Sequence, residues 1–165
     1  MYSGQHVYTV DEKRRISCPY NITFVHDLRT EWLGELTFPF VKIYPTGIAE
    51  TKPRIMLPSG FAQKGDSVML LGNGEHLEVW NAIDYGVMSQ LLEPGYLQLL
   101  KKAQEQIASS SFESMLGQKD RYLHGPAKER QEFYITLQFM LNRVSPEQKD
   151  TLVALIEETR HPAKA

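Results

Sequence analysis

The sequence predicts an α+β fold, in which a small pseudo-two-fold β-barrel formed by two tandem repeats is followed by a helical segment. Two nine-residue segments, 11–19 and 50–58, follow the same residue pattern. Up to about residue 90 the chain consists of short β-favouring runs broken by Gly, Pro and Asn, and beyond it apolar residues recur at helical spacing. We therefore expect a barrel domain over residues 1–90 and a helical region over residues 91–165.

The two nine-residue segments, DEKRRISCP and ETKPRIMLP, both read acid, any residue, Lys, any residue, Arg, Ile, two residues, Pro. Each repeat continues to a later closing strand, VKIYP at 41–45 and LEVWN at 77–81. The repeats thus extend over about 4–45 and 46–85. Neither repeat alone has enough strands to be stable, so each needs the other to complete a core.

Short runs rich in β-branched and aromatic residues, bounded by turn residues, predict the strands of the barrel. These runs lie at 6–10, 14–19, 40–45, 54–58, 67–72 and 76–81. Between the last two, Asn73-Gly74 is a strong hairpin signal. Pro19 and Pro58, at the ends of the two nine-residue segments, are expected to end strands.

Helical periodicity predicts three helices in the second region. They span 93–108, 126–144 and 145–160, with a Ser- and Gly-containing connection at 108–125. The second helix has one apolar face, made by Phe133, Leu137, Met140, Leu141 and Val144. The third helix begins with Ser145 as N-cap, Pro146 at the first helical position and Gln148 completing a capping box. It is expected to bury Leu152, Leu155 and Ile156.

Composition and charge restrict the possible functions. The net charge is −2, so any attraction to nucleic acid must be local. The single cysteine, Cys18, excludes an intramolecular disulfide and a multi-cysteine zinc site. We see no signal sequence and no apolar run long enough to span a bilayer, and therefore expect a cytoplasmic protein with no membrane association. No catalytic motif appears, so we expect neither an enzyme nor a metal or organic cofactor.

At the two nine-residue segments, and in LLGNGEHLEVWNAIDY after the second, the chain resembles the MraZ family of bacterial transcriptional regulators, within the AbrB-like swapped-hairpin superfamily. The resemblance covers roughly residues 1–90. Members of this family carry two copies of an Asp-x-x-x-Arg loop, bind direct DNA repeats in their own promoter region and assemble into rings. The resemblance implies a swapped-hairpin barrel in a nucleoid-associated homo-oligomer. The loop motif falls on Asp11 and Arg15, and on Glu50 and Arg54.

The chain departs from the family pattern in both loops. The family's Gly before the Arg, which permits a positive φ, is Arg14 in the first loop and Pro53 in the second. Because Pro cannot adopt a positive φ, the second loop must turn differently. The second acid is Glu50 instead of Asp, and the span 45–50 is too short for the helical linker that the family places between its copies.

The basic residues favour DNA contact independently of the resemblance. Lys13, Arg14 and Arg15 lie in one tight turn, and Lys52 and Arg54 lie in the equivalent turn. Lys and Arg release counterions from phosphates, and an Arg also reads guanine in the major groove. We therefore expect Arg15 and Arg54 to be the principal contacts to double-stranded DNA, with Lys13, Arg14 and Lys52 as phosphate contacts.

The acidic residues Asp11 and Glu50 are expected to orient the loops, by accepting backbone N–H bonds or by pairing with the Arg of the same turn. Arg15→Ala is expected to weaken DNA binding more than Arg54→Ala, because the second loop departs further from the motif. DNA binding requires that both arginines face one exposed surface and are not held in buried ion pairs.

An alternative function is an oligomerising protein-interaction module, antitoxin-like or anti-regulatory, that has kept the barrel and lost DNA binding. The altered loop residues Arg14 and Pro53 favour it. Under either hypothesis the apolar stripe of the C-terminal helices can close a ring contact or bind another protein.

Overall fold

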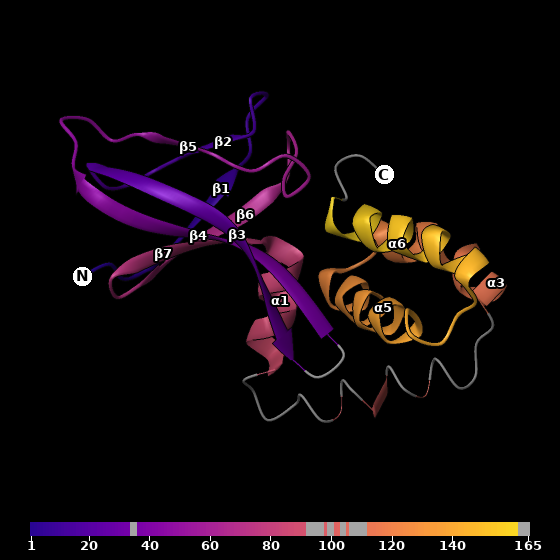
Figure 1. Cartoon of the computed structure of the whole chain (residues 1–165). Coiled ribbons are helices and arrows are strands. Elements are labelled where there is room, and N and C mark those ends of the chain that lie inside the picture. Colours follow the sequence, from indigo (N-terminus) through magenta and orange to yellow (C-terminus); the bar gives the residue numbers. More distant parts are fainter. Residues whose placement is uncertain (34–35, 92–97, 99–100, 103–104, 106–111, 162–165) are drawn as a thin grey trace. The chain divides into compact units, whose positions relative to one another are not determined.

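The computed structural model describes residues 1–33, 36–91, 98, 101–102, 105 and 112–161 (Figure 1). The chain divides into two compact units, Met1–Glu31 with Phe38–Tyr85, and Trp32–Thr37 with Gly86–Ala165. Most of the helix predicted at 93–108 lies outside the described residues. Within the described residues, no helix is long and apolar enough to cross a membrane.

The predicted α+β class is confirmed, but the described strands form two open sheets in place of a closed barrel. The strands are β1 (Gln5–Thr9), β2 (Arg15–Ser17), β3 (Ile22–Leu33), β4 (Leu36–Ile48), β5 (Arg54–Met56), β6 (Ser67–Asn73) and β7 (His76–Asn81). Five strands form one sheet in the order β1-β6-β7-β4-β3. The remaining two, β2 and β5, pair with each other (Figure 1).

The separation of the two sheets follows from the shortness of β2 and β5, which have three residues each. Pro19 and Pro58 follow these strands closely, at the positions predicted. A proline has no N–H to donate, so the ladder cannot continue through it. The β2–β5 pair therefore stays a short ribbon, which adds no hydrogen-bonded strand to the larger sheet.

The long strand β3 was not predicted from the sequence. Its segment, ITFVHDLRTEWL, has apolar residues on both faces and its charged residues, Asp27, Arg29 and Glu31, on one, so apolar and polar residues alternate over only part of its length. Residues 25–32 are all exposed, which explains the missing signal. β3 is held by its neighbour β4, where Leu36, Phe38, Phe40 and Ile43 are buried.

One apolar core connects the ribbon with the larger sheet. It contains Ile16 of β2, Ile55 of β5, and pairs of residues from β4, β6 and β7, namely Val41, Ile43, Val68, Leu70, Leu77 and Val79. Each such side chain contributes about 1.5–3 kcal/mol when it is fully buried. The two nine-residue segments thus share a single core, as the instability of a lone repeat predicts.

The hairpin predicted at Asn73-Gly74 is confirmed, with the turn shifted by one residue. Asn73 pairs with His76 across the end of β6 and β7, so Gly74 and Glu75 are the two turn residues. Gly74 has a φ of +78°, in the left-handed region that a glycine adopts without steric cost. This turn fixes the register of β6 and β7.

From Ala82 onward the chain contains helices where the sequence predicts them and also where it does not. The described helices are α1 (Ala82–Leu91), α3 (Phe112–Gly117), α4 (Lys119–Leu123), α5 (Ala127–Met140) and α6 (Pro146–Arg160). The two predicted C-terminal helices are confirmed as α5 and α6, including the capping box of Ser145 and Gln148. The expected connection at 108–125 contains α3 and α4, and α1 was not predicted.

Helix α5 is buried all round over its last two turns and is not an amphipathic helix with one buried face. Every residue from Phe133 to Met140 is buried. The helix ends at Met140, so Val144, predicted on its apolar face, lies beyond it. Within the same unit, the amide of Gln138 accepts hydrogen bonds from the N–H (2.9 Å) and the hydroxyl of Thr37 and donates to its carbonyl (2.8 Å). The Gln138 side chain of α5 thus binds the backbone of Thr37 at the start of β4.

Candidate nucleic-acid interface

The ribbon of β2 and β5 aligns the two nine-residue segments with each other. The strands are antiparallel, and Ile16 lies directly opposite Ile55, its equivalent in the other repeat. The flanking hydrogen bonds are reciprocal as well. The Cys18 N–H donates to the Pro53 carbonyl (3.1 Å), and the Leu57 N–H donates to the Arg14 carbonyl (2.8 Å). Equivalent residues of the two segments therefore occupy equivalent places about the Ile16–Ile55 pair.

Alternation along this ribbon turns the predicted arginines outward. Ile16 and Ile55 are buried, and their neighbours in each strand face away from the core. Arg15 lies opposite Met56, and Arg54 lies opposite Ser17. The Arg54 side chain is 60% exposed and the Arg15 side chain 31%, so both can be reached from solvent. The ribbon brings the two arginines onto one face.

The first loop is held by the side chain of Asp11. Its Oδ1 accepts hydrogen bonds from the N–H groups of Lys13 and Arg15, both at 2.8 Å. The Asp11 backbone also closes the turn, since its N–H donates to the Arg15 carbonyl at 3.0 Å. The pKa of the Asp11 carboxyl lies below its ordinary value, chiefly because the backbone N–H of Arg15 donates to it. The Lys13 N–H and the Arg15 side chain lower this pKa further, while desolvation opposes them. Asp11 thus makes the loop-closing contacts that the sequence analysis expects of it.

Arg14 adopts the backbone conformation for which the family motif uses Gly. Its φ is +59°, and it is the only residue other than Gly with a positive φ among those whose backbone the structure describes. A left-handed conformation is unfavourable for a residue with a Cβ atom. The first loop therefore turns through a left-handed residue at Arg14. Pro53, at the equivalent position, does not have a positive φ, so the second loop turns differently, as predicted.

The two predicted DNA-contacting arginines meet at one carboxylate. Asp11 Oδ2 accepts a hydrogen bond from Arg15 Nε at 3.0 Å and another from Arg54 Nη1 at 3.3 Å. The Asp11 side chain is 29% exposed, so this is a surface network rather than a buried ion pair. It ties the second repeat's arginine to the first repeat's loop. Sequence reasoning did not predict this contact because it depends on the register of β2 and β5.

The second loop is held by other means. The backbone carbonyl of Glu50 accepts a hydrogen bond from Asn21 Nδ2 at 3.0 Å, while its carboxylate has no ion-pair partner in the described part of the chain. Lys52 is exposed. Lys64, which was not predicted as a site residue, pairs with Glu12 at 3.3 Å beside the first loop. Lys64 lies in the connection after Pro58, outside both nine-residue segments, so the repeat did not identify it as a site residue.

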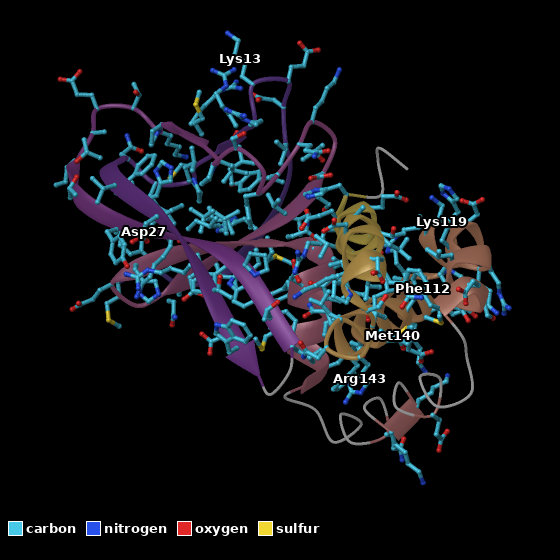
Figure 2. All side chains as sticks on the ribbon, turned by 45° about the vertical axis from the view of Figure 1, so that its right-hand side comes forward. Lys13, Asp27, Phe112, Lys119, Met140 and Arg143 are labelled. Carbon is cyan, nitrogen blue, oxygen red and sulfur yellow. The ribbon has the colours of Figure 1, made fainter. Side chains whose placement is uncertain are left out.

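Figure 2 shows the side chain of Lys13 at the end of the first loop, where it points away from the sheet into solvent. Lys13, Lys52 and Arg54 are exposed, and Arg14 and Arg15 are partly exposed. Such a group of cations on short, hydrogen-bonded turns suits contact with a polyanion, since the charges are concentrated and the backbone beneath them is ordered.

A second polar cluster lies on the β6–β7 hairpin. Glu78 accepts hydrogen bonds from Asn73 (2.8 Å) and Trp80 (3.0 Å), and its Oε2 lies 2.8 Å from His76 Nε2. Burial raises the pKa of Glu78, but these bonds outweigh it, and the pKa lies below its ordinary value. Among the described residues no three His, Cys, Asp or Glu side chains are grouped as metal ligands. The cluster fits a structural role in closing the hairpin.

Comparison of the chain with protein-family models, with curated proteins and with solved structures finds no match.

Proposed function

We propose that this chain is a sequence-specific DNA-binding transcriptional regulator resembling the MraZ family, with the two repeats arranged as a pseudo-two-fold swapped-hairpin unit in a homo-oligomer. The observation that supports it is the meeting of Arg15 and Arg54 on one outward face of the β2–β5 ribbon. Two loops that are far apart in the sequence thereby present their cations together.

The geometry supports a specific division of roles. Asp11 accepts a hydrogen bond from Arg15 Nε, which leaves the two terminal nitrogens of the Arg15 guanidinium available to bind DNA. An arginine held in this way loses little side-chain freedom when it binds a guanine edge or a phosphate. Lys13, Arg14 and Lys52 supply charge without directional readout, which suits contacts to phosphates.

The test is fluorescence anisotropy of the purified chain with labelled DNA from upstream of its own gene, against a scrambled duplex, over a series of salt concentrations. We expect tighter binding to the native duplex and a log–log salt slope of roughly −0.9 per phosphate contact. Lys149→Ala is a matched control, because Lys149 is an exposed lysine on α6, which belongs to the other compact unit. Weak binding that is equal for both duplexes would refute the proposal.

A protein-interaction module that has lost DNA binding is the second candidate. The specific observation in its favour is that both arginines already have an anionic partner in Asp11. DNA must then compete with Asp11 for the two arginines, which reduces the free energy gained on DNA binding. If Asp11→Asn strengthens binding to both duplexes equally, the arginines are general phosphate contacts that Asp11 restrains, and sequence-specific readout by them is excluded.

A further inference from the structure

Strand β3 presents an open edge. It is the last strand in the order β1-β6-β7-β4-β3, so one of its two sides has no strand partner in the described part of the chain. It is 12 residues long and contains no Pro, and its charged residues, Asp27, Arg29 and Glu31, all lie on one face. Natural sheets usually protect an edge with Pro, with charged side chains or by keeping the edge strand short, because its free N–H and C=O groups pair readily with another strand. At the opposite edge, β1 has only five residues.

Apolar side chains accompany this open edge. Trp32 is 66% exposed, Val25 58% and Leu28 51%. Three large apolar side chains along one strand form a pattern that soluble monomers seldom leave uncovered. They are accompanied by charges, since Arg29 Nε lies 3.3 Å from Asp27 Oδ1 and Arg29 Nη2 donates to the Tyr44 hydroxyl at 2.9 Å. Figure 2 labels Asp27 on this part of the sheet.

The order of residues in β3 is complementary to itself. Alternation places Phe24, Leu28 and Trp32 on one face of the strand, and Asp27 and Arg29 on the other. An antiparallel copy of the strand, related by a two-fold axis through Leu28, brings Asp27 opposite Arg29 of the copy, and Arg29 opposite its Asp27. On the other face the two Leu28 side chains meet at the axis, and each Phe24 lies opposite a Trp32. Opposite charges and aromatic pairs are the cross-strand contacts that stabilise antiparallel strands.

Neighbouring registers lack this complementarity. An axis through residue 27 places two Asp27 side chains opposite each other, and an axis through residue 29 does the same for Arg29. Like charges in directly opposed positions are destabilising. A shift by half a residue is excluded, since it opposes residues whose side chains lie on opposite faces of the sheet. An axis through Thr30 also opposes unlike charges, Arg29 and Glu31, but it pairs only residues 27–33, whereas an axis through Leu28 pairs residues 23–33. The register centred on Leu28 therefore combines opposed charges with the longer pairing.

We propose that β3 is a homodimerisation edge, which binds β3 of a second copy of this chain in antiparallel register about Leu28. A two-fold contact of this kind is closed, so it produces a dimer and does not extend indefinitely. The inference supplies an interface for the homo-oligomer of the proposed function, but it depends on no contact with DNA. Its test measures mass, so the two proposals fail separately.

The experiment is sedimentation equilibrium of the full chain over a range of concentrations, for the unmodified protein and for Asp27→Arg, Arg29→Asp and the double variant. Each single variant replaces two attractive pairs by two repulsive ones, and we expect the dimer Kd to rise by roughly ten- to a hundredfold. The double variant restores opposite charges in the same register, so it should recover most of the affinity. Lys149→Glu, an exposed charge reversal on α6, is the control and should leave the Kd unchanged.

A second measurement separates loss of the interface from loss of the fold. At a concentration well below the dimer Kd, circular dichroism melting should give nearly the same Tm for the unmodified protein and the three β3 variants, because Asp27 and Arg29 are about half exposed. Amide hydrogen exchange in residues 25–31 should slow as the concentration of unmodified protein rises. A chain that stays monomeric at all concentrations would overturn the proposal. So would an oligomer whose mass is the same in all three β3 variants, since another surface would then hold it together.

Discussion

Replacing Gln138 with Leu tests whether one side chain of α5 fixes the strand end at Thr37. Gln138 is 3% exposed, and its amide makes three hydrogen bonds with Thr37. Leu is similar in size, so it removes these bonds without leaving a large cavity. The Thr37 N–H then loses its partner, while the Thr37 carbonyl keeps Arg160 Nη2 at 3.5 Å. Since an unpaired buried polar group costs about 1–3 kcal/mol, and Thr37 is half-buried, we expect a loss of about 2 kcal/mol.

Urea denaturation followed by circular dichroism measures this loss as a lower midpoint at an unchanged m-value. Gln118→Leu is the matched control, since Gln118 caps α4 without a side-chain hydrogen bond, and it should change the stability by less than about 0.5 kcal/mol. If Gln138→Leu unfolds at the same urea concentration as this control, the amide contacts to Thr37 contribute nothing net, and the argument from unpaired groups is wrong.

Three further predictions concern the first loop and the β6–β7 hairpin. Arg14→Gly removes the cost of a left-handed residue, about 1–2 kcal/mol, and adds about 0.5–1 kcal/mol of backbone freedom in the unfolded chain, so urea denaturation should show a small net stabilisation. A destabilised variant would contradict the backbone argument. Because the folded pKa of Glu78 is lowered, its contribution to stability is complete above its ordinary pKa of about 4.5 and is lost as pH falls through the lower folded value. Glu78→Gln should therefore flatten the fall of Tm in acid, and an unchanged profile would exclude this carboxyl as its source. In the anisotropy assay Arg15→Ala should raise the Kd for DNA more than Arg54→Ala, because the Arg15 side chain is held to Asp11 by the shorter bond, 3.0 Å against 3.3 Å for Arg54. Equal losses would contradict that ranking.

The repeat was the most informative feature of the sequence. Equal spacing of Arg15 and Arg54 before Ile16 and Ile55 predicted that the two segments play equivalent roles, and in the structure Ile16 lies opposite Ile55. The turn residues were informative as well. Gly74 and the two prolines that follow β2 and β5 act through local backbone geometry, which the sequence specifies directly.

Elements that depend on tertiary context were harder to predict. The residues of β3 from 25 to 32 are exposed on both faces, so burial of one face could not be used to predict this strand. Helix α5 is buried all round over its last two turns, so the single apolar face predicted for it includes too few residues. The sharing of Asp11 by Arg15 and Arg54 requires the register of two strands from different repeats. No local pattern contains that information, since the pairing is set by the core that Ile16 and Ile55 complete.

The pairing of β2 with β5 also affects how the chain folds during synthesis. When the first segment leaves the ribosome, the residues that cover Ile16 have not yet been made, and its strand remains unpaired until β5 emerges. Contacts between residues so far apart in sequence form slowly, and an unpaired apolar strand favours aggregation in the interval. A fragment that ends before residue 50 lacks the partner strand altogether, so it should be recovered as an insoluble or degraded product.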